Sequence, residues 1–327
     1  MSSMNEEFHI SKYHLVTSLK FSRISDSDYL PLIVVNNEYI LTFIESKIVL
    51  LDINSLSEIC SIKEEQTYPP SICVYILKLK DDRYALGYRL GDVKILSINL
   101  DLKVMKIDQT MKIDNEYIST IIELTNDNLL CSCIHRKITI FKKNKKGEYY
   151  KLKDINREKY GFDSVFQVNE NTFFGSTCMA EEISLYNFET GQNVLTKKIN
   201  EISGWPHTSE KISQNYALVG GMVKLYLIDL TNLNITNQIE NFQNECILFF
   251  NGYIFCGGRS DNDVKIIQYK FKEEEKTLEQ ISELKLNNII DGVCEIVFLK
   301  QEKYLTLYVS SRQSSNNCPI NIYGYEN

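Results

Sequence analysis

The sequence predicts an all-β fold, a seven-bladed β-propeller of four-stranded blades formed by residues 1–327 as a single domain. Three observations predict it. A short strand recurs about every 44 residues, each copy lies in the same order of strands and turns, and the last unit lacks a strand that the N-terminus can supply. Internal repeats of about 40 to 50 residues are typical of propeller blades.

The recurring short strand sets the register of the repeat. Its copies begin at positions 39, 84, 129, 172, 216, 253 and 304, as in Tyr84-Ala85-Leu86 and Tyr216-Ala217-Leu218. The steps between them are 45, 45, 43, 44, 37 and 51 residues, so changes in length fall in the last units only. Seven units follow from this count.

Each unit repeats one order of elements. An apolar strand is followed by a polar turn such as Lys80-Asp81-Asp82, then the short strand, then a third strand such as Ile138-Thr139-Ile140-Phe141, and in most units a more polar fourth strand. Strands of period two bounded by turn residues, four to a unit, are typical of a propeller blade. The expected blades are approximately residues 30–63, 71–110, 116–155, 161–199, 208–240, 244–287 and 292–327.

The seventh unit ends directly after its third strand, at residues 325–327, so its outer strand is missing there. Residues 8–21 form an unassigned strand-like stretch at the other end of the chain. We expect this stretch to lie beside Ile320 to Tyr325 and close the ring, because such pairing removes two exposed sheet edges at once.

Residues 118–141, ISTIIELTNDNLLCSCIHRKITIF, resemble a repeat of the WD-repeat family, with Phe141 in the place of the closing Trp. The resemblance covers essentially the whole chain. The Asp that follows that Trp survives only as Asp52 and Asp229, and no Gly-His pair opens a blade. The buried polar network of the family is therefore not available here, and apolar contacts are expected to pack the blades.

The net charge, the N-terminal sequence and the cysteines indicate which classes of partner and which cellular compartment to expect. A net charge of −7 and a pI near 5.4 argue against nucleic acid as a partner, which needs clustered Lys and Arg. The first 12 residues lack the pattern of a secretory signal, and no run approaches the roughly 20 apolar residues of a membrane span. Nine Cys, mostly within apolar runs, indicate free thiols. We therefore expect a cytoplasmic protein, with the nucleus as an alternative.

No arrangement of residues predicts catalysis, a cofactor or a metal site. Cys131 and Cys133 have no second pair to complete a zinc site, and no nucleophile or phosphate-loop motif occurs. A propeller enzyme with an axial metal would need acidic or His residues converging on the innermost strands. The candidates, including Glu123 and Glu295, are scattered along the chain and alternate with apolar residues.

The resemblance implies that the segments between blades and the turns between second and third strands emerge together on the narrow face of the propeller. The aromatic and basic residues expected there are Tyr68, Tyr160, Phe162 and Trp205 between blades, and Arg89, His135, Arg259 and Arg312 in the turns. Aromatic residues and Arg dominate binding hot spots. Trp205, the only Trp, either serves such a site or packs onto a neighbouring loop.

These residues favour a non-enzymatic scaffold or adaptor that binds a peptide or protein segment on the narrow face, as a monomeric propeller within a complex. Two alternatives remain open: a propeller enzyme with an axial metal, and a structural subunit of a large assembly. The charged runs Lys142 to Lys146 and Lys272 to Lys276 are expected on the opposite, wide face as solvated loop tips. A membrane or an acidic partner for them stays open.

Overall fold

A computed structural model of the protein describes residues 9–22, 31–64, 72–177, 180–199, 208–221, 224–240, 243–260, 263–286, 295–301, 304–310 and 317–325. Apart from one 3-10 turn, η1 (Ile10–Lys12), the regular elements are strands. Nowhere in the described ranges is there a helix with the length and apolar character to cross a bilayer.

The strands form seven four-stranded antiparallel sheets, which we call blades I to VII. Blade I consists of β2 (Leu32–Val34), β3 (Tyr39–Ile44), β4 (Lys47–Asp52) and β5 (Glu58–Lys63). Blade II consists of β6 (Cys73–Lys78), β7 (Tyr84–Tyr88), β8 (Asp92–Asn99) and β9 (Val104–Lys112). Blade III consists of β10 (Ile118–Glu123), β11 (Leu129–Cys133), β12 (Lys137–Lys143) and β13 (Tyr149–Asn156). The prediction of an all-β fold built from four-stranded antiparallel sheets is confirmed.

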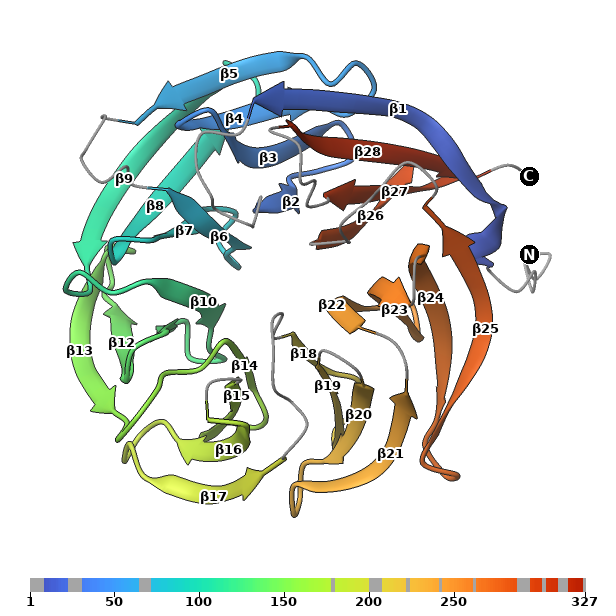
Figure 1. Ribbon diagram of the computed structural model, residues 1–327. Coiled ribbons are helices and arrows are strands. Elements are labelled where there is room, and N and C mark those ends of the chain that lie inside the picture. The colour runs from blue at the N-terminus through green and yellow to red at the C-terminus, as the bar shows by residue number, and fades with distance from the viewer. Residues whose placement is uncertain are drawn as a thin grey trace, which may run out of the picture.

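Blades IV to VI follow the same order of strands. Blade IV consists of β14 (Ser164–Gln167), β15 (Thr172–Thr177), β16 (Glu182–Asn187) and β17 (Asn193–Lys198). Blade V consists of β18 (Ser209–Lys211), β19 (Tyr216–Gly220), β20 (Lys224–Asp229) and β21 (Asn234–Glu240). Blade VI consists of β22 (Gln243–Phe250), β23 (Tyr253–Ser260), β24 (Asp263–Lys272) and β25 (Thr277–Lys285). Figure 1 shows the blades around a central axis.

Blade VII combines the two ends of the described chain. Its strands are β26 (Glu295–Gln301), β27 (Tyr304–Ser310), β28 (Asn317–Tyr325) and, outermost, β1 (Tyr13–Ser22). β1 runs antiparallel to β28, from Tyr13 opposite Tyr325 to Ser22 opposite Asn317. Around the axis, contacts join the innermost strands in the order β2, β6, β10, β14, β18, β22 and β26, and β26 contacts β2.

The core lies between the blades. Alternate side chains of a strand point to opposite faces of its sheet, so the middle strands of blades I to VI bury residues toward both neighbours. Between blades II and III, Val93 and Ile95 meet Ile121, Leu129 and Phe141 in one apolar cluster. Phe141, at the position of the family Trp, is 2% exposed.

The cysteines described by the structure are free thiols, most of them buried. Cys131 and Cys133 belong to the apolar cluster between blades II and III. Burial raises the pKa of the Cys133 thiol to about 12. Both side chains therefore act as small apolar residues of the core at neutral pH.

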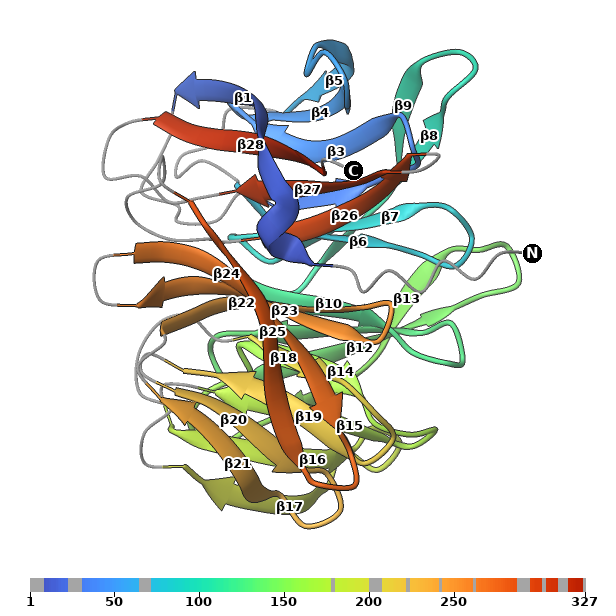
Figure 2. The same ribbon diagram turned by 90° about the vertical axis from the view of Figure 1, so that its right-hand side faces the viewer.

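Because neighbouring strands alternate in direction, the connections fall at two opposite ends of the blades. The narrow face carries the turns between second and third strands and the segments between blades. The wide face carries the other hairpin turns. Figure 2 shows these ends from the side, with the β8–β9 and β12–β13 hairpins of the wide face projecting to the right.

At the wide face, the last residue of each innermost strand in blades II to V bonds to the preceding blade. The bonds are Lys78 Nζ to Val35 O (3.2 Å), Lys80 N to Glu123 Oε2 (2.7 Å), Thr125 N to Gln167 Oε1 (2.8 Å) and Lys211 Nζ to Val168 O (2.6 Å). These side chains repeat about every 44 residues and lock neighbouring blades together.

Candidate functional site

Five of the eight residues predicted for the narrow face are described by the structure. Four of them, Arg89, His135, Tyr160 and Phe162, lie at the two junctions that flank blade III. Tyr68, Trp205 and Arg312 lie outside the described residues. Arg259 lies within β23, opposite Val264 of β24, rather than in the turn after that strand. The described narrow face is therefore best defined around blade III.

The junction between blades II and III begins with the turn after β7. Arg89 starts this turn and donates its backbone N–H to the Ile72 carbonyl at 2.9 Å. Gly91 has a φ of +81°, and a Cβ there would lie 2.3 Å from the Ile113 carbonyl oxygen. Only glycine allows so close an approach. The turn is thus pressed against the segment that leads to β10 and brings Arg89 beside Tyr117.

Arg89 has an unusual environment for a cation on this face. Its guanidinium carbon lies 5.6 Å from the centre of the Tyr117 ring, within the range of a cation–π interaction. Its Nε is buried without a hydrogen-bond partner, and none of the described carboxylates pairs with it. A buried N–H without a partner costs free energy. Because Nε is shielded from solvent, the two Nη groups are the donors that a carboxylate or carbonyl of a partner molecule would contact.

Other cations around this junction are paired. Lys112 lies 3.1 Å from Asp92, and Lys137 contacts Asp114. On the acidic side, Glu116 keeps one buried carboxylate oxygen, Oε2, without a hydrogen-bond partner in the described structure. Unsatisfied groups of both signs therefore occur at the junction between blades II and III.

His135 lies in the turn after β11, as predicted, together with Arg136, and both are exposed. Arg136 has a φ of 59° and donates from Nε to the Lys159 carbonyl at 2.9 Å. This turn thus places two exposed side chains, His135 and Arg136, at the narrow-face end of blade III.

The junction between blades III and IV is organised by Arg157, which the sequence analysis missed. Its Nη1 donates to the carbonyls of Tyr160 at 2.6 Å and Gly161 at 3.0 Å, and its Nη2 pairs with Glu182. Its guanidinium carbon lies 3.9 Å from the centre of the Phe162 ring. With 6% of its side chain exposed, Arg157 is a structural clamp.

The expectation that Phe162 faces a partner is wrong, because its ring is fully buried. It packs edge-on against Phe173 at 6.1 Å and Tyr186 at 5.6 Å between ring centres. Gly175 leaves the space for it, since a Cβ there would lie 2.4 Å from the ring. Tyr160 is half-buried and gives its carbonyl to Arg157. Because the Tyr160 carbonyl is used in this way, its aromatic side chain is the group that a partner could contact.

Comparison with solved structures places the whole architecture. The structure entitled Crystal Structure of Mitotic Checkpoint Complex matches with a TM-score of 0.72 at 10% identity, over 99% of this chain and 94% of that one. Structure of U3-55K matches at 0.69 and 11%, over 92% and 98%. Crystal structure of RRP9 WD40 repeats matches at 0.69 and 11%, over 93% and 97%. The fold is that of a WD-repeat β-propeller.

No protein-family model matches the chain, and no curated protein matches it in sequence. At 10 to 11% identity the structural matches show the fold alone. The propeller keeps the backbone of WD repeats while replacing most of the family's signature side chains. Its binding residues must therefore be identified from its own contacts.

No group of three or more His, Cys, Asp or Glu in the described ranges is placed to hold a metal ion. Glu123 accepts the Lys80 backbone N–H through Oε2, which uses half of its carboxylate in blade packing. For Glu295 the structure describes the position in β26 but not the side chain.

Proposed function

We propose that this propeller is a non-enzymatic scaffold that binds a peptide or protein segment on the narrow face of blades II and III. One observation carries the proposal: Arg89 stacks beside Tyr117 and has no described carboxylate partner, whereas Lys112 and Lys137 nearby are paired. Arg and Tyr are among the residues most enriched in binding hot spots. An anionic group on the partner would complete the pairing of Arg89.

The structural matches support the scaffold role by analogy of fold. One matched chain comes from a mitotic checkpoint complex, by its title an assembly. We propose that this propeller likewise works as one monomeric component of a complex, in the cytoplasm or the nucleus. It would contribute a rigid surface rather than chemistry.

Affinity purification of the full chain followed by mass spectrometry tests the narrow-face site. We expect Arg89→Ala to lose at least about tenfold in capture of the main partner, because hot-spot truncations cost about 2 kcal/mol or more. Arg136→Ala removes a neighbouring exposed cation of the same face and is the matched control. Unchanged capture by Arg89→Ala, with Arg136→Ala also unchanged, would exclude this site.

Elemental analysis of the pure protein separates the scaffold from the enzyme alternative. A scaffold needs no metal, so we expect no stoichiometric divalent ion. Finding one would favour the reading as an enzyme with an axial metal site.

We also propose that seven blades form a closed ring, with β1 as the outer strand of blade VII. The pairing of β1 with β28 and the contact of β26 with β2 support it. Deleting residues 1–22 should then expose an edge and lower the melting temperature by several degrees, or cause aggregation. Deleting residues 1–8 alone retains β1 and is the control. Identical melting curves for the two deletions would contradict ring closure.

A further inference from the structure

The charge of the propeller is unevenly distributed. Residues 72–160, which form blades II and III, contain 18 Lys and Arg against 12 Asp and Glu, a net charge of +6. The whole chain carries −7, so the remaining residues carry −13. One sector of an acidic protein is therefore basic, and the wide-face hairpin of blade III contains its densest run of Lys.

That hairpin joins β12 to β13 and presents three exposed cations. Lys142, Lys145 and Lys146 are exposed, and in the part of the chain that the structure describes no carboxylate pairs with any of them. Lys143, between them in sequence, points inward and lies 2.8 Å from Asp81 of blade II. The hairpin thus separates one structural lysine from three that face solvent.

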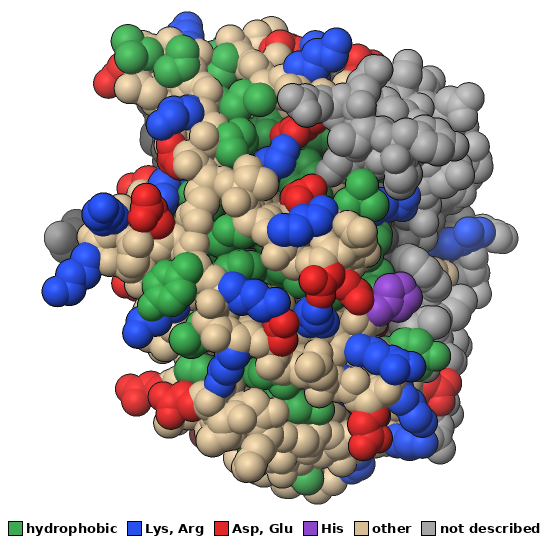
Figure 3. All heavy atoms as spheres, turned by 90° about the vertical axis from the view of Figure 1, so that its left-hand side faces the viewer, with side chains coloured by type: hydrophobic (Ala, Val, Ile, Leu, Met, Phe, Trp, Pro, Cys, Tyr) green, Lys and Arg blue, Asp and Glu red, His purple; other side chains and the backbone are tan. Residues whose placement is uncertain are grey.

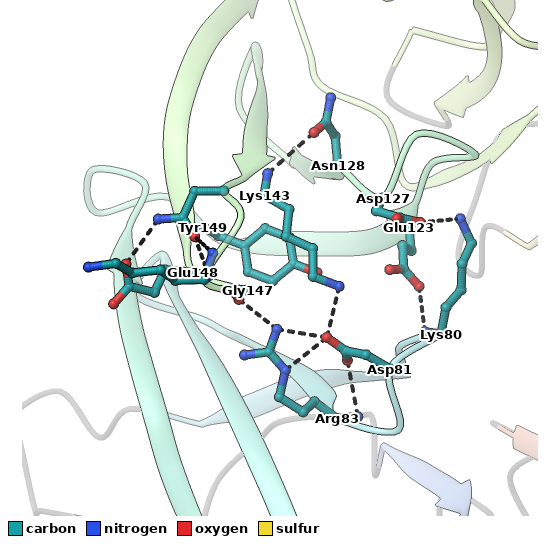
Figure 4. Close-up of polar contacts among 12 residues, drawn as sticks. Lys80, Asp81, Arg83, Glu123, Asp127, Asn128, Lys143, Gly147, Glu148 and Tyr149 are labelled. Atoms are coloured by element: carbon teal, nitrogen blue, oxygen red, sulfur yellow. Dashed lines mark hydrogen bonds and ion pairs between the residues drawn. The ribbon is translucent and has the colours of Figure 1, made fainter.

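Contacts with blade II hold the hairpin in place. Arg83 lies 2.8 Å from Asp81 and donates from Nη2 to the Gly147 carbonyl at 2.6 Å, within the network drawn in Figure 4. The Tyr149 backbone N–H donates to Gln109 Oε1 of β9 at 2.8 Å. The cations therefore stand on a fixed support, which lowers the entropic cost of binding.

Apolar side chains lie next to these cations. Tyr150 and Leu152 are each 48% exposed. Tyr150 stands opposite Lys142 in the β12–β13 ladder, and Leu152 lies at a bulge of β13. β13 is the edge of its sheet, with β12 as its only sheet neighbour. Figure 3, which views this side of the molecule, shows hydrophobic side chains between those of Lys and Arg.

We propose that this surface, Lys142, Lys145, Lys146, Tyr150 and Leu152, called here the blade III rim, docks an acidic protein segment that also carries apolar side chains. Carboxylates of the segment pair with the three lysines, and its apolar side chains cover Tyr150 and Leu152. The rim lies at the wide-face end of blade III, away from Arg89. It is a second docking surface and does not depend on the proposed narrow-face site.

Two other anionic partners fit the rim less well. The tip of the hairpin, residues 144–148, is Asn-Lys-Lys-Gly-Glu without an apolar side chain, so it offers nothing to insert into a bilayer. The exposed cations of the hairpin are all Lys, whereas planar Arg is preferred for bidentate contacts with phosphate. A carboxylate-rich protein segment matches both the Lys side chains and the apolar strand behind them.

Fluorescence anisotropy on the full chain tests the proposal with a labelled 12-residue peptide in which Glu alternates with Leu and Phe. The rim variant is Lys142→Glu/Lys145→Glu/Lys146→Glu. The control, Lys63→Glu/Lys198→Glu/Lys270→Glu, makes the same change in net charge at exposed lysines of blades I, IV and VI. Thermal melting first verifies that both variants fold.

We expect the rim variant to weaken peptide binding at least about tenfold and the control less than about twofold, with wild-type affinity falling as salt rises. Tyr150→Ser/Leu152→Ser should weaken binding while leaving the salt dependence intact. Arg89→Ala should bind the peptide like wild type, which separates this proposal from the narrow-face site. Equal weakening by rim and control variants would overturn the proposal. So would absence of peptide binding at low salt, or binding to phosphatidylserine vesicles or single-stranded RNA alone.

Discussion

The two narrow-face junctions that flank blade III use arginine in opposite ways. Between blades III and IV, Arg157 is 6% exposed, pairs with Glu182 and donates to two carbonyls. Between blades II and III, Arg89 stacks beside Tyr117 with no described carboxylate partner. Both arginines have a buried Nε without a hydrogen-bond partner, so the difference lies in their Nη groups. Arg157, whose Nη groups are paired inside the propeller, stabilises the fold. An arginine whose Nη groups are unused is available to a partner.

The same contrast separates two carboxylates. Asp81 takes hydrogen bonds from Arg83 and Lys143, which outweigh the opposing effect of burial and hold its pKa at about 2. Burial raises the pKa of Glu210, on the innermost strand of blade V, to about 7. Among the described residues no side chain pairs with Glu210. Internal pairing therefore decides whether a charged group stabilises the propeller or is held at a cost.

The largest effect is expected at Arg157. Arg157→Ala would leave the half-buried Glu182 without its cation and two carbonyls without their donor. Removing one partner of a buried ion pair costs about 3–5 kcal/mol, and urea unfolding should show a loss of that order. Arg136→Ala, an exposed arginine of the same face, should lose under about 1 kcal/mol. Comparable losses in the two variants would remove the distinction between a clamp and a surface cation.

Glu210→Gln tests the cost of an unpaired carboxylate. Because its folded pKa, about 7, lies above its ordinary value of 4.5, the folded state binds the proton more tightly. Stability should then fall as pH rises from about 4.5 to 7 and stay low above that. The Gln variant lacks this pH-dependent loss and should be more stable than wild type by roughly 3 kcal/mol at pH 8. Melting curves at pH 5 and 8 measure it, and an equal difference at both pH values would refute the assignment.

Asp81→Asn tests the opposite case. A carboxylate whose folded pKa is lowered from 3.8 to about 2 stabilises the folded state above its ordinary pKa, and loses that contribution as pH falls through about 2. About a third of the side chain is exposed, so solvent screening should limit the loss at pH 7 to under about 1 kcal/mol. Unfolding of both proteins from pH 7 to 2 checks the sign. The gap between them should shrink as the pH falls.

The sequence contains most of the information for the strands and little for the contacts between side chains. The short strand beginning near Tyr39, Tyr84 and Leu129 predicts β3, β7 and β11. A strand that is buried on both faces of its sheet is recognisable as a short, mostly apolar run. Phe141 at the family's Trp position is buried as its pattern indicates. Such local periodicity survives even where the signature residues of the family are lost.

The site was predicted less well, for a physical reason. In the sequence, Arg89 and Phe162 both fall in segments that connect strands. Only the packing of neighbouring blades decides which of the two side chains is buried. Arg157 pairs with Glu182, which is 25 positions away in the sequence, and no local sequence pattern indicates such a pair. Arg259 lies in a strand because β23 and β24 extend further than the corresponding strands of blade II.

The smallest change in stability is expected at Arg89, where the comparison between the arginines is sharpest. Arg89→Ala removes a buried N–H that lacks a partner, which stabilises the fold, and one cation–π contact, which destabilises it. The two effects offset each other. The free energy of unfolding should therefore change by under about 0.5 kcal/mol, as for an ordinary surface position. Arg89→Lys keeps the charge but not the planar group that lies beside Tyr117. Urea unfolding of the two variants should give nearly the same midpoint as wild type, while partner capture should follow the order wild type, Lys, Ala. A loss at Arg89 as large as that at Arg157 would mean that both arginines hold blades together, and the narrow-face site would then have to be assigned to other residues.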